Sequence, residues 1–273
     1  MRSKQTWLRA ALCVSLLAMP VVLVSAELGN VKNLRAPQPS AQTVEMFEAI
    51  KSKDIEVKII PKDETESRVF IKNNTKQPLN VKLPAAFAGM PVLAQRVGSG
   101  TGGSRTGGGA SSGGQQSMGG GMGGGGMGMG GGGMGGGMFN IAPEQEGRFK
   151  VATVCLEHGK KEPRANIPYE IKPIETFTAK PGVKELLTAF GNQKISQRAA
   201  QAAAWHLSND MSWEQLAAKK IEHLNGTSEF WFSREEIQAG MQLARSAMVE
   251  AEANAKAVAV EEGVKFTPVF EKR

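Results

Sequence analysis

Residues 55–83 read IEVKIIPKDETESRVFIKNNTKQPLNVKL, and apolar and polar side chains alternate in three runs along this stretch. In the first run Ile55, Val57 and Ile59 share one side and charged residues share the other. A period of two is typical of β-strands that bury one face. Residues that favour turns (Pro, Asn, Asp and Thr) separate the runs. The stretch therefore predicts three short antiparallel strands.

The remaining strands are expected on both sides of a low-complexity tract. Residues 43–97 form the first part of a predicted β-sandwich, and residues 138–177, with a strand over 148–156, form the second part. Strands of this length and spacing resemble an immunoglobulin-like sandwich, although the disulfide and the tryptophan that mark antibody domains are absent. We expect the tract between them to be an enlarged loop of that sandwich.

The intervening tract, residues 98–137, consists almost entirely of Gly, Ser and Met. Glycine has the largest backbone entropy to lose on folding and has no side chain to bury. We therefore expect this tract to be a disordered loop. Six methionines lie in it or at its edge, and thioether sulfur is a soft ligand that suits Cu(I). The candidate Cu(I) ligands are Met118, Met122, Met127, Met129, Met134 and Met138; a low-complexity linker without metal is the alternative.

The second half of the chain is predicted to be helical, which makes the fold class α+β. Within the predicted helical domain, residues 178–273, helices are expected over 181–190, 196–208, 212–225 and 233–262. The third and fourth begin with Ser-x-x-Gln and Ser-x-x-Glu, the pattern of a capping box. Gly or Asn-Gly follows three of the four helices, as is common at helix C-termini. About four helices should therefore follow the sandwich.

The N-terminus predicts export from the cytosol. Residues 1–26 begin with basic residues, continue as an apolar run, and end in small residues before Glu27, which is typical of a cleavable signal peptide. Cleavage near Ala26 would leave a flexible segment over residues 27–42. No second long apolar run follows, so we expect no transmembrane segment after cleavage and a secreted or periplasmic protein.

Charge and cysteine content exclude some classes of function. The formal net charge of +7 falls to about +4 once the leader is removed, and the basic residues are interspersed with acidic ones. With a single tyrosine and no basic stripe, nucleic acid is not an expected partner. Only Cys155 remains after cleavage, so no intramolecular disulfide can stabilise the mature chain.

Cys155, in the segment VCLEHGK (154–160), is the strongest candidate for chemistry. Strand alternation places it on the side of Phe149 and Val151, so one interpretation is an inert thiol in the core. A second is a nucleophile activated by a histidine such as His158 or His206. A third is a metal site that combines Cys155 with the same histidines.

A fourth interpretation comes from a resemblance. Cys155 is followed by Gln201-Ala202-Ala203-Ala204-Trp205, which resembles the Q-x-A-I-W motif of bacterial surface thioester domains, with alanine in place of isoleucine. The resemblance covers only these residues, within about 149–207. It implies that the side chains of Cys155 and Gln201 join in an internal thioester, which reacts with amines and fixes the protein covalently to a target.

Together these observations favour a secreted or periplasmic, non-enzymatic binding or structural protein. A thioester-type covalent binder that uses Cys155 and Gln201 is the first alternative, and an enzyme that uses Cys155 and a histidine is the second. The expected partner is a protein or a component of a cell surface. The sequence assigns neither a cofactor nor an oligomeric state.

Overall fold

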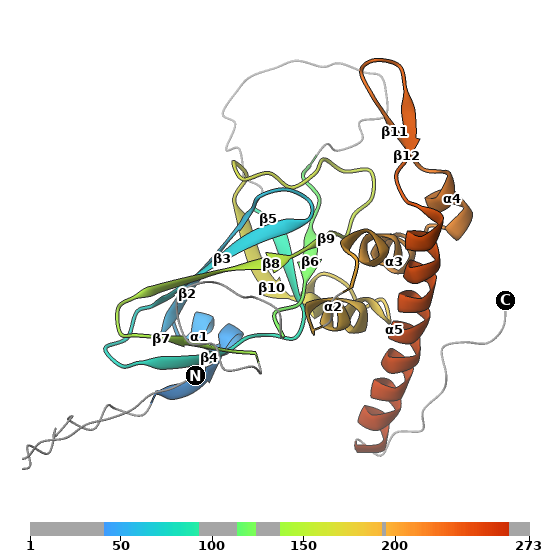
Figure 1. The fold of residues 1–273 in the computed structure, drawn as a ribbon. Helices are drawn as coiled ribbons and strands as arrows, with labels where there is room; N and C mark the ends of the chain where they lie inside the picture. Colours follow the sequence, from blue (N-terminus) through green and yellow to red (C-terminus); the bar gives the residue numbers. More distant parts are fainter. Residues whose placement is uncertain (1–40, 93–113, 124–136, 193–194, 262–273) are drawn as a thin grey trace, which may run out of the picture. The chain divides into compact units, whose positions relative to one another are not determined.

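The computed structural model describes residues 41–92, 114–123, 137–192 and 195–261 (Figure 1). The chain divides into two units, residues 1–38 and 39–273, and every described residue belongs to the second unit. The predicted signal peptide and nearly all of the predicted flexible segment 27–42 lie outside the described residues. The strands and the helices, by contrast, belong to one compact unit.

The largest element of the fold is a seven-stranded sheet in which every neighbouring pair is antiparallel. The fold is therefore α+β with a large antiparallel sheet. In spatial order the strands are β8 (Glu146–Ala152), β3 (Glu66–Asn73), β2 (Ile55–Pro61), β10 (Tyr169–Pro173), β5 (Phe87–Pro91), β6 (Met118–Gly120) and β9 (Val154–Cys155). The alternation in residues 55–83 corresponds to β2, β3 and β4 (Leu79–Lys82).

The two ends of this sheet are adjacent in the chain. β8 and β9 are the first and last strands in spatial order, yet Thr153 alone separates them. The sheet must therefore curl until its outer strands meet in one bent segment. The backbone N–H of Thr153 donates to the Thr65 carbonyl (2.8 Å), which fixes the bend against the turn between β2 and β3. This bend directs Cys155 away from the side of the sheet that Phe149 and Val151 bury.

A second, three-stranded sheet has the order β1 (Gln42–Glu45), β4 and β7 (Met138–Ile141), with β1 parallel to β4. The helix α1 (Met46–Lys51) follows β1 directly. One hydrophobic cluster contains Leu79, Val81 and Ile141 of this sheet together with residues of β2, β3 and β8. The two sheets therefore share a core. Although residues 43–52 look like a short helix in sequence, the first of them extend β1 because they pair with β4, and the helix begins only at Met46.

Part of the Gly/Met-rich tract is ordered, so the prediction of a disordered loop over 98–137 was wrong for residues 114–123. β6 lies within them and pairs with β5 and β9. Glycine permits this because the backbone approaches its neighbours too closely for a side chain: a Cβ added at Gly121 would lie 2.4 Å from the Leu187 carbonyl oxygen. The tract thus contributes a strand because its glycine backbone packs closely against neighbouring backbone, and not because it buries many side chains. Residues 98–113 and 124–136 lie outside the described residues.

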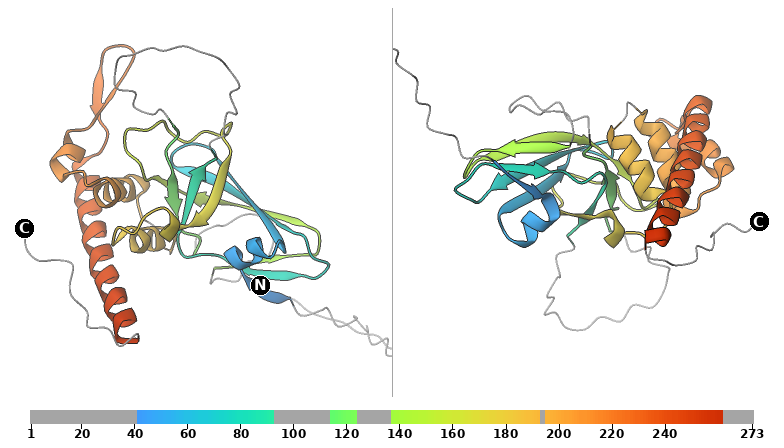
Figure 2. Two further views of the ribbon diagram at one scale, coloured as in Figure 1. Left: turned by 180° about the vertical axis from the view of Figure 1, so that it is seen from behind. Right: turned by 90° about the horizontal axis from the view of Figure 1, so that it is seen from below.

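The helices lie against the β6–β9 end of the sheet (Figure 2). After the short 3₁₀ turn η1 (Ile174–Thr176), α2 (Val183–Asn192) contacts β6 and α3 (Gln197–Asn209) contacts β9. The long helix α5 (Arg234–Glu261) packs on both α2 and α3. The buried side chains of this layer include alanines of α3, such as Ala200, Ala203 and Ala204, and the larger Leu186 and Leu187 of α2. Small side chains bring α3 close to the sheet.

The third predicted helix is shorter than expected. Ser212 forms the expected capping box with Gln215 at the start of α4 (Trp213–Ala218), but the helix ends there. The residues up to 225 instead enter a hairpin of β11 (Lys220–Glu222) and β12 (Ser228–Phe230). The hairpin forms in place of further helix because the Trp231 N–H donates to the Lys219 carbonyl (2.8 Å) at the base of the hairpin. Among the described residues, four α-helices (α2 to α5) follow β10, as predicted, with the β11–β12 hairpin between the last two.

Candidate functional site

Cys155 lies on the edge strand β9, and its backbone polar groups point away from the sheet. Leu156 N–H donates to the Ser117 carbonyl (2.9 Å), and Cys155 is opposite Met118 in the register. In an antiparallel pair of this kind, the N–H and C=O of the opposed residue face outward. A buried outward-facing pair requires partners from another element.

Gln201 of α3 supplies those partners. Its Oε1 accepts from the Cys155 N–H (2.8 Å), and its Nε2 donates to the Cys155 carbonyl (2.8 Å). The side chain is buried, with 4% of the residue exposed, and Cys155 is 1% exposed. α3 approaches closely enough because Ala200, Ala203 and Ala204 of the same helix are fully buried. The thioester resemblance paired these two residues, and the structure brings them together.

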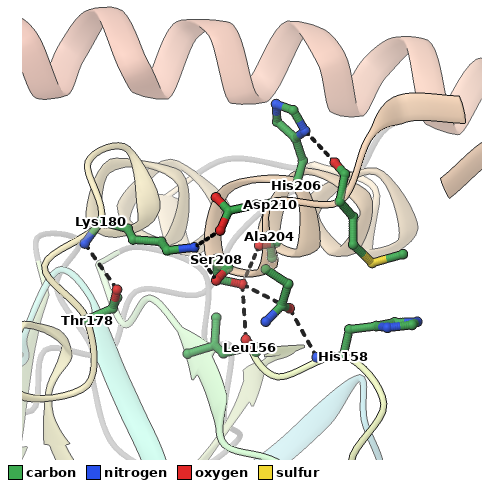
Figure 3. Close-up of polar contacts among 10 residues, drawn as sticks. Leu156, His158, Thr178, Lys180, Ala204, His206, Ser208 and Asp210 are labelled. Atoms are coloured by element: carbon green, nitrogen blue, oxygen red, sulfur yellow. Dashed lines mark hydrogen bonds and ion pairs between the residues drawn. The ribbon is translucent and has the colours of Figure 1, made fainter. Parts of the chain in front are cut away.

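The C-terminal half of α3 is also tied to the segment after β9 (Figure 3). Ser208 Oγ donates to the Leu156 carbonyl (3.0 Å), and the His158 N–H donates to Asn209 Oδ1 (3.0 Å). Lys180 Nζ donates to the Ser208 carbonyl (3.0 Å) and forms an ion pair with Asp210, beyond the last turn of the helix. Together with the Gln201 bonds, these contacts hold α3 against β9 and the segment after it on both sides of Trp205. The Cys155–Gln201 pair therefore lies between two segments, α3 and β9, that hydrogen bonds hold together.

Electrostatics keep the Cys155 thiol protonated. Burial raises its pKa well above the usual range, and the negative charges of Glu64 and Glu162 raise it further. The thiol is free, since Cys155 forms no disulfide. A thiol of this kind is a poor nucleophile toward reagents in solution, because only the thiolate reacts.

A pocket of about 230 Å³ gives access to the pair. Cys155 and Gln201 line it together with aromatic side chains, Trp205 and Trp231, and with exposed residues such as His158. The pocket thus joins two buried groups to the surface. Its lining combines an amide, a thiol, two indoles and several charged groups.

The predicted histidine partners do not contact the thiol. The ring of His158 lines the pocket, but its Nε2 bonds Lys219 Nζ (3.1 Å) and its edge contacts the Trp205 ring (4.8 Å between centroids). His206 is held elsewhere, with Nδ1 bonded to the Met211 carbonyl (2.7 Å) and its ring stacked on Trp213. Across the described ranges, no three His, Cys, Asp or Glu side chains are arranged to hold a metal ion.

The candidate Cu(I) methionines that the structure describes do not share one environment. Met118 and Met122 are buried in the core between the sheets, and the Met118 sulfur accepts from Ser67 Oγ (3.2 Å). Met138 in β7 is half exposed. Met127, Met129 and Met134 lie outside the described residues.

Of the pocket residues, the sequence pointed to Cys155, His158, Gln201 and Trp205; the rest of the lining was missed, including Lys219 and Trp231. Lys219 follows α4, and Trp231 follows β12, so the backbone pair at the base of the hairpin brings both to the site. Lys219 was expected within a continuous helix over 212–225, and Trp231 had no predicted role. The only signal was the aromatic pair Trp231-Phe232 directly before the capping box of the fourth predicted helix.

No protein-family model, no curated protein and no solved structure is significantly similar to this chain. Within the part of the chain that the structure describes, no helix combines the length and the hydrophobicity needed to cross a bilayer. The fold and the site therefore define an α+β protein in which a buried cysteine and a buried glutamine meet at the bottom of an aromatic pocket.

Proposed function

We propose that this is a non-enzymatic binding protein whose binding chemistry is an internal thioester between Cys155 Sγ and the side-chain carbonyl carbon of Gln201. The observation that carries the proposal is the pair of 2.8 Å hydrogen bonds that hold the Gln201 carboxamide against the Cys155 backbone. These bonds place an electrophilic carbon beside the residue that carries the thiol. Fixed proximity of this kind replaces an encounter in solution and lowers the entropic part of the barrier.

The hydrogen bond from the Cys155 N–H favours the reaction directly. It ends on Oε1, the atom on which negative charge develops when the sulfur attacks the carbonyl carbon. Serine proteases use the same relationship, because the backbone N–H of the attacking serine is one donor of the oxyanion hole. The amide oxygen of Gln201 thus already occupies a partial oxyanion site.

The step balances without a cofactor. A bond forms between Cys155 Sγ and Gln201 Cδ, the Cδ–Nε2 bond breaks, and the thiol proton leaves with the nitrogen as ammonia. The hydrogen bond from Nε2 to the Cys155 carbonyl is lost with the ammonia, whereas the bond to Oε1 is retained. Burial of both residues protects the thioester from water. An incoming amine attacks the same carbon, forms an amide with Gln201 and releases the Cys155 thiol.

We also propose that the protein is exported and that its partner is a protein or a cell-surface component that carries amines. The support for export is the basic and apolar leader of residues 1–26. We propose further that the two sheets form an immunoglobulin-like sandwich, supported by the core they share. Such sandwiches serve as binding and spacer domains in many surface proteins, which is an argument from analogy.

A cysteine–histidine enzyme has less support. None of the three histidines, all of them within the described residues, bonds the thiol. The raised pKa of Cys155 also opposes a resting thiolate. The geometry therefore favours a thiol that attacks one carbonyl held beside it over a thiolate that turns over substrates.

The intact mass of the purified mature protein tests this function. We expect the wild type to be lighter than its sequence mass by one ammonia, and methylamine to convert it to the N-methylamide of Gln201. Two control variants, Cys155→Ser and Gln201→Glu, should show their sequence masses and no reaction with methylamine. A wild-type protein at its full sequence mass would overturn the proposal.

A further inference from the structure

A lysine ammonium lies between two tryptophan rings at the pocket. Lys219 Nζ is 4.9 Å from the centroid of the Trp231 ring and 5.4 Å from that of Trp205. Both distances are within the range of a cation–π interaction. His158 Nε2 lies 3.1 Å from the same nitrogen, so it accepts a hydrogen bond from the ammonium. Two indoles and one imidazole therefore surround a single primary ammonium group.

Separate segments of backbone build this aromatic cage, defined as Trp205, Trp231 and His158. Trp205 lies one turn after Gln201 on α3, and its ring is packed edge-on against His158 (4.8 Å). His158 is held by the bond from its N–H to Asn209 (Figure 3). Trp231 N–H donates to the Lys219 carbonyl (2.8 Å), which fixes that indole to the base of the hairpin. The cage is thus supported independently of the lysine side chain inside it.

Charged side chains of both signs line the pocket: Lys160 pairs with Glu157 and Arg198 donates to the Trp231 carbonyl, whereas two carboxylates lack such partners. Glu64 and Glu162 line it, and among the described residues neither carboxylate forms an ion pair. Burial lowers the pKa of Lys219, and the negative charge of Glu162 opposes this effect. The pocket therefore desolvates an ammonium group and compensates it with two indole faces, an imidazole nitrogen and nearby carboxylates.

We propose that the aromatic cage is a binding site for a primary ammonium group of a partner, such as a lysine side chain, and that Lys219 is its resident occupant. A partner's lysine displaces the Lys219 side chain, which is long and half-buried and so can turn to solvent. This inference deepens the proposed function and rests on it. Residues of the cage and Gln201 line the same pocket, so an amine bound in the cage lies close to the thioester carbon.

The cage predicts a preference for amines over alcohols. A hydroxyl group has no charge to interact with the indole faces, whereas an ammonium gains from each of them. Burial lowers the pKa of an ammonium at this position, as it does for Lys219, which favours the free amine that attack requires. Lys219 meanwhile shields the cage from other cations until a partner competes with it.

The test uses the full mature chain with Cys155→Ala, which cannot form a thioester. The probes are N-acetyl-lysine methylamide and its uncharged analogue N-acetyl-norleucine methylamide, and binding is followed by tryptophan fluorescence. With Lys219→Met added, we expect the lysine probe to bind roughly 3- to 30-fold more tightly than the norleucine probe. Without that substitution the lysine probe should bind more weakly, because Lys219 competes with it.

Two further variants make the result specific. Trp231→Leu combined with Lys219→Met should remove the preference for the lysine probe. Lys220→Met is the matched control, because Lys220 lies over the Phe230 ring (5.4 Å) and does not line the pocket. It should leave lysine-probe binding unchanged. Equal binding of the two probes to the Lys219→Met protein would overturn the inference.

Failure of this inference is distinguishable from failure of the proposed function. The thioester is judged by mass in the protein that retains Cys155, whereas the cage is judged by binding in the protein that lacks it. A missing thioester with a clear preference for the lysine probe would refute the proposed function and leave the ammonium site. A thioester without that preference would refute the ammonium site alone.

Discussion

The side-chain amide of Gln201 and the backbone of Cys155, 46 residues apart in the chain, form two hydrogen bonds of 2.8 Å each. The amide takes the place of a neighbouring strand at the outer edge of β9. It therefore satisfies buried backbone groups that would otherwise lack partners, and it holds a carboxamide against the backbone of the residue that carries the thiol. The stability of this edge and the chemistry of the site depend on the same side chain.

The structural part of this role can be measured in the Cys155→Ala background, where no thioester forms. Gln201→Ala there should lower the free energy of unfolding by roughly 1–3 kcal/mol, because a buried N–H and C=O lose their partners. Urea denaturation followed by circular dichroism measures the change. Gln197→Ala is a matched control on the same helix: Gln197 is only half-buried and donates one bond, to the Thr153 carbonyl (3.2 Å). Equal losses for the two variants would contradict the special role of Gln201.

Titration of the thiol distinguishes three states of Cys155. In the Gln201→Glu variant, which has no amide to lose, we expect no reaction with a thiol reagent until the protein unfolds, because Cys155 is buried and its pKa is raised. The native wild type should also fail to react with the thiol reagent. After treatment with methylamine and unfolding, it should show one reactive thiol. Rapid labelling of the native Gln201→Glu protein would instead indicate an exposed thiolate.

The pKa of His158 reports on the cation in the cage. Burial lowers this pKa, and the positive charge of Lys219 lowers it further. Lys219→Met removes the positive charge, whereas His158 stays buried. Without the repulsion from Lys219, the protonated imidazole is more stable than in the wild type. We expect the His158 pKa to rise in this variant, as measured by NMR of the imidazole protons. Lys220→Met should leave it unchanged, and a fall in the Lys219→Met protein would show that the two groups do not interact as described.

The ordered part of the glycine-rich tract should be sensitive to a single methyl group. A Cβ at Gly121 would lie 2.4 Å from the Leu187 carbonyl oxygen and 2.8 Å from that of Ala85. Because both are backbone atoms, Gly121→Ala should destabilise the protein by about 1–3 kcal/mol. At Gly114 an added Cβ meets nothing within 4 Å, so Gly114→Ala serves as the control in thermal unfolding. A tolerated Gly121→Ala would mean that β6 does not pack against α2 in this way.

Local patterns predicted most of the secondary structure. Alternation identified the strands of residues 55–83, and the capping serines Ser212 and Ser233 marked the starts of α4 and α5, because both signals depend on residues close together in the chain. The end of α4 could not be predicted from such signals. It depends on the pairing of Lys219 with Trp231, which becomes possible only when the chain returns as a hairpin.

The sequence by itself determined which residues could form strands and helices, and it drew attention to Cys155 and to Gln201 in its alanine-rich helix. Only the tertiary structure decided that these two residues meet, that Gly119 and Gly120 belong to a sheet, and that Lys219 occupies a cage of aromatic rings. The physical reason is that periodicity and capping are properties of neighbouring residues. Close approach of distant backbones, by contrast, depends on how the curled sheet and the α2–α3–α5 layer pack together.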